Sequence, residues 1–497
     1  MIYHFRFIIR NFPYFHISIF PYLLLTSYLL LLTSCLCLHA DLPKDILRML
    51  EAGEFSKYED AVAKLDEKGA DRHFAIGKLY EGNYLEGFSL IKNGGREDFW
   101  FQYLRFMAAM EREFLSKESE HFKIRYTNPN DVMVDFALEN LETIYRKNGE
   151  ILGHFPEDKI LVEIYPDKET FAAASTLGME ILEKSGTVGI CKFNRIMLIS
   201  PRTLPLGYRW LDTLSHEYAH FLINRITRYN CPLWLHEGIA RYTDTQWRKY
   251  PPSDESGHPN FISDYSMQKL TDAVAENRLI PFEKMSPSLV YLPTRDDISL
   301  AFAEVSSFVD FFARNYGKDA LGRLLTEMQS MTEKNAFRKI TRQSFGALNR
   351  RWIDNLKKLK LETATAGIPD TPDYVARTED DFLSLDARQN VRLGDAFRQK
   401  GNFVAALSQY EKSFEKEKSP VVAVKIARTQ VSMGKLTEAK ENLLKVVKGN
   451  ENYLTPYLVL AEISAMEGNE GEAKHFLKEA FSINPFYPGL YQKLSEL

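Results

Sequence analysis

Cysteine is scarce in this chain of 497 residues, and so is any excess of charge of one sign. Four cysteines occur, and two of them, Cys35 and Cys37, lie in an apolar stretch near the start. The rest of the chain therefore cannot be a disulfide-dense scaffold. The 63 lysines and arginines nearly balance the 67 aspartates and glutamates, and no long basic run appears. The chain therefore lacks the excess of positive charge that would attract a phosphate backbone, and nucleic-acid binding is not expected.

What the chain does contain is the composition of a globular protein, with 45% hydrophobic and 26% charged residues. At about 150 residues per domain, the length predicts roughly three domains. Changes of pattern divide the chain into an N-terminal signal (1–40), a helical domain (41–118), an α+β domain (119–360), a linker (361–388) and an all-α repeat domain (389–497). The predicted fold class is therefore α+β at the centre with helical domains on both sides.

The N-terminal segment has the pattern of an export signal. A basic flank without acids precedes an uncharged run over residues 17–38. Three alternatives fit this pattern: cleavage after Ala40, lipid attachment at Cys35 within a stretch similar to a bacterial lipoprotein box, or an uncleaved membrane anchor. Each of them places the remaining chain in the periplasm or cell envelope, attached to the membrane in the last two cases.

The central region alternates between strand and helix patterns. Residues 122–126 and 159–165 alternate as strands, and residues 136–152 between them have the spacing of an amphipathic helix. Residues 187–200 predict a β-hairpin, and helices are expected to dominate from residue 211 onward. Two cysteines of this region, Cys191 and Cys231, are expected either to form a disulfide or to be free thiols.

A periodic register marks the C-terminal region. Gly401, Gly434 and Gly468 lie 33 and 34 residues apart. Each is preceded by a small residue and followed by an alanine and then a large residue, at Gly394, Ala427, Ala461, Ala406, Ala439, Ala473, Tyr410, Leu443 and Leu477. This register resembles the tetratricopeptide repeat, in which paired antiparallel helices pack closely through small residues. It predicts three units and a capping helix after residue 485.

A metal-binding pattern occurs in residues 211–224, LDTLSHEYAHFLIN. A spacing of four residues on a helix places His216 and His220 on one face, one turn apart. Two neutral imidazoles in this arrangement can hold one zinc ion. Glu217 lies about 100° around the helix from His216, where a carboxylate can take a proton from the water that such an ion activates.

A second pattern follows at residues 231–244, CPLWLHEGIARYTD. The Cys-Pro pair predicts a break, and the residues after it predict a helix. This helix carries Glu237 and then Gly238, which would permit close packing. A catalytic zinc site needs a third protein ligand and an open fourth position, and Glu237 is the candidate for that ligand.

Together the two patterns resemble the thermolysin-like zinc peptidases, or gluzincins, and most closely the peptidase-MA-like families with HExxH followed by WLxEGxA. The resemblance covers about residues 119–357 and implies a zincin catalytic domain. It implies that His216, His220 and Glu237 bind Zn²⁺ and that Glu217 is the general base. It also implies that the hairpin at 187–200 forms a sheet edge to which a peptide substrate adds as a strand.

Two positions depart from the family pattern. Arg241 stands where an aspartate is expected, which leaves open whether Asp212 or Asn224 orients a ligand imidazole. Phe302 stands where related sequences often have a tyrosine. Tyr242 is therefore the candidate for stabilising the oxyanion in place of that tyrosine.

The expected function is therefore that of an exported zinc metallopeptidase whose repeats bind a protein partner or substrate. Some alternatives remain open at this stage. His236 could replace Glu237 as ligand, Glu237 could be a buried salt-bridge partner, and HEYAH could be a helix without metal. The whole chain could also be a non-catalytic adaptor or chaperone-like protein of the cell envelope with a structural zinc site.

Overall fold

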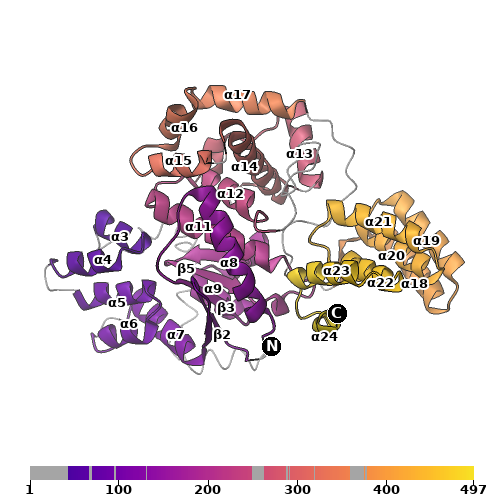
Figure 1. Ribbon diagram of the computed structural model, residues 1–497, viewed down its shortest axis with the longest axis horizontal. Coiled ribbons are helices and arrows are strands. Elements are labelled where there is room, and N and C mark those ends of the chain that lie inside the picture. The colour runs from indigo at the N-terminus through magenta and orange to yellow at the C-terminus, as the bar shows by residue number, and fades with distance from the viewer. Residues whose placement is uncertain are drawn as a thin grey trace.

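The computed structural model describes residues 43–65, 70–94, 97–129, 131–248, 262, 264–286, 289, 292–317, 319–358, 374 and 378–496 (Figure 1). The predicted export signal, with Cys35 and Ala40, lies outside these residues, as does most of the predicted linker. Among the helices that are described, none has the length and the apolar character needed to cross a membrane.

The N-terminal part consists of helices that pack in sequence order. They are α3 (Lys44–Glu51), α4 (Phe55–Val62), α5 (Ala70–Tyr80), α6 (Tyr84–Ile91) and α7 (Phe99–Glu113). Each packs against the next through buried side chains, among them Tyr58, Leu79 and Leu104. The helical character predicted for this part of the chain is confirmed.

A five-stranded mixed sheet follows at the centre of the molecule. Its strands are β1 (Leu115–Glu118), β2 (Phe122–Tyr126), β3 (Ile160–Tyr165), β4 (Gly189–Lys192) and β5 (Arg195–Ile199). They lie in the order β1-β2-β3-β5-β4, where β2, β3 and β5 are parallel and each outer strand is antiparallel to its neighbour. This places β4 at one edge of the sheet. The predicted α+β fold class is confirmed, and strands β2 to β5 match the sequence patterns.

Strand β1 was not expected from the sequence. All four of its residues are exposed, so they lack the alternation of apolar and polar side chains that predicts a strand. Pairing with β2 makes it a strand, with Leu115 opposite Tyr126 and Glu118 opposite Lys123. The sheet thus begins before residue 119.

The hairpin of β4 and β5 is anchored by its turn. Phe193 and Asn194 have φ angles of 55° and 57°, and positive values at both positions are what a two-residue type I′ turn requires. The Phe193 ring is fully buried between the helices α5 and α7, with its centroid 5.6 Å from that of Tyr80 and 5.5 Å from that of Tyr103. The N-terminal helices therefore hold the hairpin that carries β4.

A buried ion pair joins the same helices to the sheet. Glu163 of β3 and Arg195 of β5 are both fully buried, with Oε2 of Glu163 3.0 Å from Nε of Arg195. The hydroxyl groups of Tyr165 and Tyr84 donate hydrogen bonds of 2.6 and 2.5 Å to this carboxylate. The charge of each group is thus compensated by its partner within the interior.

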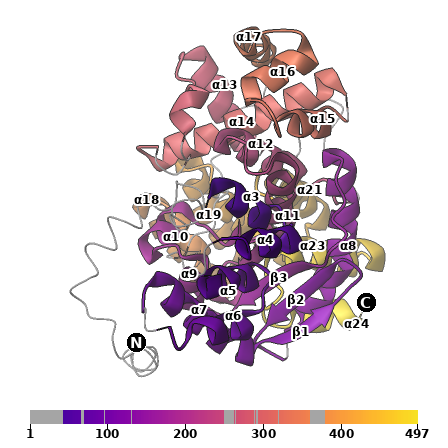
Figure 2. The same ribbon diagram turned by 90° about the vertical axis from the view of Figure 1, so that its left-hand side faces the viewer.

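Further helices cover the sheet and extend beyond it. Those nearest the sheet are α8 (Met133–Leu152), α9 (Lys168–Ser175), α10 (Met179–Ser185), α11 (Trp210–Thr227) and α12 (Leu233–Thr243). The others are α13 (Asp264–Ala275), α14 (Arg295–Tyr316), α15 (Ala320–Glu327), α16 (Glu333–Thr341) and α17 (Phe345–Leu356), with 3₁₀ turns at η3 (Pro201–Thr203) and η4 (Phe282–Met285). Helix α8 packs on β2, and α11 packs on β4 and β5. Helices α13 to α17 lie beyond α11 and α12, at the end opposite the sheet (Figure 2).

The C-terminal helices form antiparallel pairs. The pairs are α18 (Leu385–Gln399) with α19 (Phe403–Lys416), α20 (Pro420–Ser432) with α21 (Leu436–Gly449), and α22 (Leu454–Met466) with α23 (Glu470–Ile483), followed by α24 (Leu490–Glu496). Gly401, Gly434 and Gly468 end the first helix of each pair with φ angles of 72° to 76°, a conformation that favours glycine. A methyl group on Gly394 would lie 2.6 Å from the Tyr410 ring. In the first pair, a small and a large position of the predicted register, Gly394 and Tyr410, are therefore in close contact, as in tetratricopeptide repeats.

Helix α18 begins inside the stretch predicted as a linker. The Ser384 side chain accepts a hydrogen bond from the Ala387 amide and caps the helix at Leu385. Just before it, the turn η6 (Glu379–Phe382) lies against α20. Composition alone did not predict this, because the stretch is polar and has no apolar period.

The last repeat docks on the start of helix α11. The guanidinium of Arg209 donates hydrogen bonds to Glu479 at 2.7 Å and to the Tyr457 hydroxyl at 2.9 Å. The Trp210 indole donates to the carbonyl of Phe481 at 3.1 Å. These contacts fix the N-terminal end of α11 against α22 and α23.

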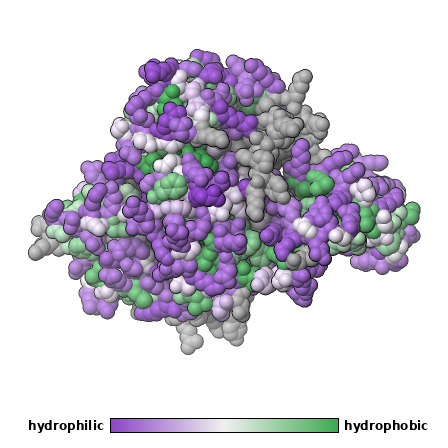
Figure 3. All heavy atoms as spheres, in the orientation of Figure 1, coloured by the Kyte–Doolittle hydropathy of each residue, from purple (hydrophilic) through white to green (hydrophobic). Residues whose placement is uncertain are grey.

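Hydrophilic side chains cover most of the face shown in Figure 3, with hydrophobic ones in small groups between them. Among the large apolar side chains that stay exposed, Leu385 and Val404 belong to α18 and α19, at the end of the repeats farthest from the sheet. Small groups of this kind do not define an interface by themselves.

Candidate metal centre

Helices α11 and α12 pack side by side and bring the predicted ligands together. His216 and His220 lie one turn apart on α11, and their Nε2 atoms are 3.1 Å apart. Oε2 of Glu237, on α12, is 3.5 Å from Nε2 of His216 and 3.7 Å from Nε2 of His220. The three donor atoms therefore face one point.

This arrangement fits a zinc ion. With bonds of about 2.0 to 2.1 Å in a tetrahedral site, donor atoms lie about 3.3 Å from one another. The observed separations of 3.1, 3.5 and 3.7 Å are close to this value. Two imidazoles with one carboxylate are also a ligand set that catalytic zinc sites use.

Glu217 lies next to the three donors but is held from another direction. One carboxylate oxygen and the imidazole nitrogens of His216 and His220 all lie within 4.8 Å of one another. The backbone N–H of Cys191 in β4 donates a hydrogen bond to Glu217. Burial, and then the neighbouring Glu237 carboxylate, raise the pKa of Glu217 well above its usual range.

Strand β4 approaches Glu217 closely at a glycine. A methyl group on Gly189 would lie 2.7 Å from Cγ2 of Thr213 and 3.0 Å from Cγ of Glu217. Both distances are too short for an ordinary contact. The sheet edge and the acid side chain can thus be neighbours because residue 189 has no side chain.

The imidazoles are held in the neutral form that a metal needs. Burial lowers the pKa of His216 to about 3, and the positive charge of Arg241 adds to the effect. Burial also lowers the pKa of His220 well below its usual range. Neutral imidazole has the free lone pair that binds a metal ion.

The outer nitrogen of His220 contacts a third histidine. Nδ1 of His220 lies 2.5 Å from Nδ1 of His236, and Nε2 of His236 lies 2.9 Å from Oδ1 of Asn224. Burial lowers the pKa of His236 to about 4. Both nitrogens of His236 are thus directed at His220 and Asn224 rather than at Glu237 and His216.

Buried contacts fix the two helices relative to each other. The Asn148 amide of α8 donates to the Ser215 carbonyl at 3.0 Å, and the Ser215 hydroxyl donates to the Thr243 carbonyl at 3.1 Å. On the other side of α12, a methyl group on Gly238 would lie 2.8 Å from the Val305 carbonyl. The close packing predicted for this glycine is confirmed.

Asp212 does not orient a ligand imidazole. Its carboxylate forms an ion pair with Arg248 and accepts a hydrogen bond of 3.1 Å from the Trp247 indole. Arg248 also reaches Glu451 of the repeat region at 2.8 Å. The sequence alone could not show these contacts, because the two partners of Asp212 come from a later part of the chain. Of the two predicted candidates, Asn224 has a connection to a ligand, through His236.

The remaining predicted positions lie around the site. Tyr242 is half-buried on α12, and burial and the charge of Asp310 on α14 raise its pKa. Its predicted oxyanion role stays a prediction. Phe302 lies under the guanidinium of Arg241, with 5.3 Å between the ring centroid and the guanidinium carbon. Arg241 thus brings a positive charge near His216, at the position where the sequence pattern predicts an aspartate.

Two other groups in the structure have side chains of the types that bind metals. Cys191 and Cys231 form no disulfide in the structure, so of the two predicted alternatives it has the thiols. A second group, made of Glu120, His121 and Glu142, could hold a cation by geometry. There, Nδ1 of His121 lies 2.6 Å from the Glu142 carboxylate, a pair that needs no metal to be satisfied.

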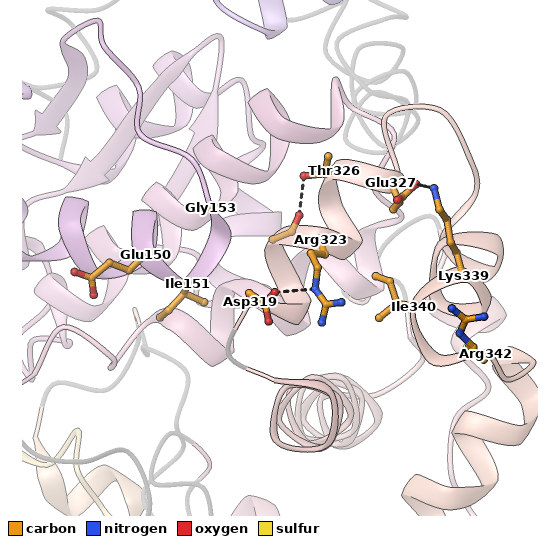
Figure 4. Close-up of a pocket in the computed structure, with 11 residues that line it drawn as sticks. Glu150, Ile151, Gly153, Asp319, Arg323, Thr326, Glu327, Lys339, Ile340 and Arg342 are labelled. Atoms are coloured by element: carbon orange, nitrogen blue, oxygen red, sulfur yellow. Dashed lines mark hydrogen bonds and ion pairs between the residues drawn. The ribbon is translucent and has the colours of Figure 1, made fainter.

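A groove of about 520 Å³ lies away from the metal centre, between the end of α8 and helices α15 and α16 (Figure 4). Two of its cations already have acidic partners: Arg323 pairs with Asp319 at 2.9 Å, and Lys339 pairs with Glu327 at 2.6 Å. No ligand of the candidate metal centre lines it, so it takes no part in the chemistry considered below.

Comparison with known proteins places the site within a recognised family model. Residues 151–358, which include α11 and α12, match the model described as the Peptidase MA superfamily. Among solved structures, the crystal structure of yeast Tom70 is similar over 90% of this chain and 85% of that one, with 12% identity and a TM-score of 0.22. A TM-score of 0.22 is too low to establish that the two chains share a fold. A search of curated proteins gives no match.

Proposed function

We propose that the Peptidase MA superfamily domain at residues 151–358 is a zinc-dependent peptidase that hydrolyses peptide bonds. The observation that carries this proposal is the convergence of His216, His220 and Glu237 on one point, with Glu217 beside it. The three converging groups would hold the ion. A bound zinc ion supplies an electrophile that polarises a carbonyl group and makes water acidic enough to attack it.

The chain's own contribution to the reaction is the movement of a proton. Glu217 is held by the Cys191 amide beside the donors, within reach of the attacking water. Its carboxylate takes a proton from that water and later gives it to the amine that leaves. A raised pKa suits this task, because it makes the Glu217 carboxylate a stronger base toward that proton.

The position of β4 supports a peptide as substrate. This strand is at the sheet edge, and it packs against α11, which carries the site. An extended peptide added along such an edge gains backbone hydrogen bonds, whatever its side chains are. The scissile bond would then lie next to Glu217, because Gly189 and Cys191 of this strand contact that residue.

The repeats would bind a protein partner or the substrate protein. Stacked helix pairs present an extended surface for such binding. Here that surface already accommodates the chain's own acidic turn: the Tyr453 hydroxyl donates to Glu379 at 2.7 Å, and Lys425 pairs with Asp380 at 3.3 Å. The proposal further includes export by the N-terminal signal, with cleavage after Ala40, lipid attachment at Cys35 or retention as an uncleaved membrane anchor.

A peptide-library digest tests the proposed activity. The purified full chain, loaded with zinc, is expected to cleave some library members. A chelator should stop cleavage, and added zinc should restore it. Cleavage that persists after complete metal removal would contradict the proposal. Zinc binding without cleavage of any peptide would instead favour the non-catalytic adaptor.

A further inference from the structure

We propose that His236 and Asn224 are positioning residues that fix the imidazole of His220 for the metal. They would do this by a chain of two hydrogen bonds from His220 through His236 to Asn224. The inference rests on the proposed zinc site, but it concerns residues that the proposed reaction does not use.

Geometry places the three side chains in line. His220 and Asn224 are one turn apart on α11, and His236 enters between them from α12. Its ring lies 4.6 Å from that of His220 between centroids, with both of its nitrogens within hydrogen-bonding distance of a partner. His236 itself is 8% exposed, so water cannot easily replace these partners.

The hydrogen atoms along this chain follow from the binding of a metal. Nε2 of His220 faces Glu237 and His216, so its lone pair is the one that a metal would take. The proton of the neutral His220 imidazole must then be on Nδ1. Nδ1 of His236 must accept that proton's hydrogen bond, which leaves the second proton on Nε2 of His236. This atom donates to Oδ1 of Asn224, which can only accept.

His220 and His236 thus each use one nitrogen as a donor, Nδ1 of His236 and Oδ1 of Asn224 are the acceptors, and these roles agree along the chain. The chain ends at a neutral amide instead of a carboxylate. In many metal sites a carboxylate fixes the orientation and the tautomer of a ligand histidine, and here this chain of hydrogen bonds would do so. Position 241, where an acid is expected, carries Arg241 instead, so the orientation of His220 comes from the residue before Glu237.

Zinc affinity of the full chain, measured by competition with a chromophoric chelator, tests the inference. His236→Phe keeps a flat ring of similar size but removes both nitrogens, so we expect zinc binding to weaken by about 10- to 100-fold. His236→Asn keeps an acceptor near the position of Nδ1 and is expected to recover most of the loss. Asn224→Leu removes only the hydrogen bond between Asn224 and His236, so it should weaken zinc binding less than His236→Phe does.

Cobalt(II) in place of zinc gives a second readout, because its visible absorption reports the geometry of the ligands. The spectrum should change in His236→Phe and return toward that of the wild type in His236→Asn. His121→Phe, in the second histidine group, is the matched control and should bind zinc as the wild type does.

Three results would overturn the inference. One is wild-type affinity in both His236→Phe and Asn224→Leu. Another is equal weakening in His236→Phe and His236→Asn, which would indicate packing rather than hydrogen bonding. The third is a wild-type chain that takes up no zinc, which would overturn the proposed function as well. A chain that binds zinc with the predicted order of affinities but cleaves no peptide would contradict the proposed function alone.

Discussion

Replacing Glu217 with glutamine is expected to reduce peptide hydrolysis by about 10²- to 10⁴-fold, the usual contribution of a general base. The change keeps the size of the side chain and an oxygen that can accept the hydrogen bond from the Cys191 amide. It removes the ability to take a proton. Because His216, His220 and Glu237 are untouched, the variant should bind zinc as the wild type does. Rates on a cleaved peptide and zinc content measure the two effects separately.

The control for this variant is Glu142→Gln, the same chemical change in the second histidine group. It should leave the rate of hydrolysis within about twofold of the wild type, since substitutions away from the site have small effects. If Glu217→Gln hydrolyses peptides as fast as the wild type, then Glu217 is not the base.

Replacing Gly189 with alanine is the second change with a large expected effect. The added methyl group would meet Cγ2 of Thr213 at 2.7 Å and Cγ of Glu217 at 3.0 Å, so the strand or the acid side chain must move. A displacement of about 1 Å at reacting groups can cost about 10²-fold in rate. We therefore expect a loss of that order, measured as kcat/KM, with zinc content unchanged.

Gly346→Ala provides the comparison. Gly346 lies on α17, and the nearest atom to an added methyl group is 3.8 Å away, an ordinary contact. This variant should have wild-type activity and stability. Wild-type kcat/KM in Gly189→Ala would show that β4 is not held against Glu217 in the way described.

Much of the fold could be predicted because its patterns are local. Strand β2 and the helix α8 follow from spacings within single segments, and the repeats follow from a register that recurs at Gly401, Gly434 and Gly468. Strand β1 could not be predicted, since its exposed side chains carry no periodic signal and its partner strand decides its conformation.

The docking of the repeats on α11 could not be predicted from the sequence, because it depends on contacts between distant parts of the chain. Arg209 and its partner Glu479 are separated by 270 positions along the chain. A surface arginine and a buried one look alike in a sequence, and neither composition nor periodicity identifies such a partner. The contact matters for the site, because α11 continues from Arg209 directly into the turn that carries His216.

The candidate site could be predicted in part. The HExxH and WLHEG patterns placed His216, His220 and Glu237 on two helices, and the structure brings their donor atoms together. The role of His236 could not be assigned, because a histidine beside a ligand can face the metal or another ligand. The rotation of α12 relative to α11 decides between these, and it depends on packing at Gly238 against α14. The sequence signal for this role is a histidine directly before Glu237 together with Asn224 four residues after His220.

The central claim is that His216, His220 and Glu237 hold a zinc ion, and metal content tests it most directly. Mass spectrometry on the purified full chain, prepared with added zinc, would compare the wild type with His216→Ala. The account predicts about one zinc per wild-type chain, as for a site with three protein ligands, and a loss of that zinc in the variant. A wild type without zinc, or a variant that keeps it, would contradict the account.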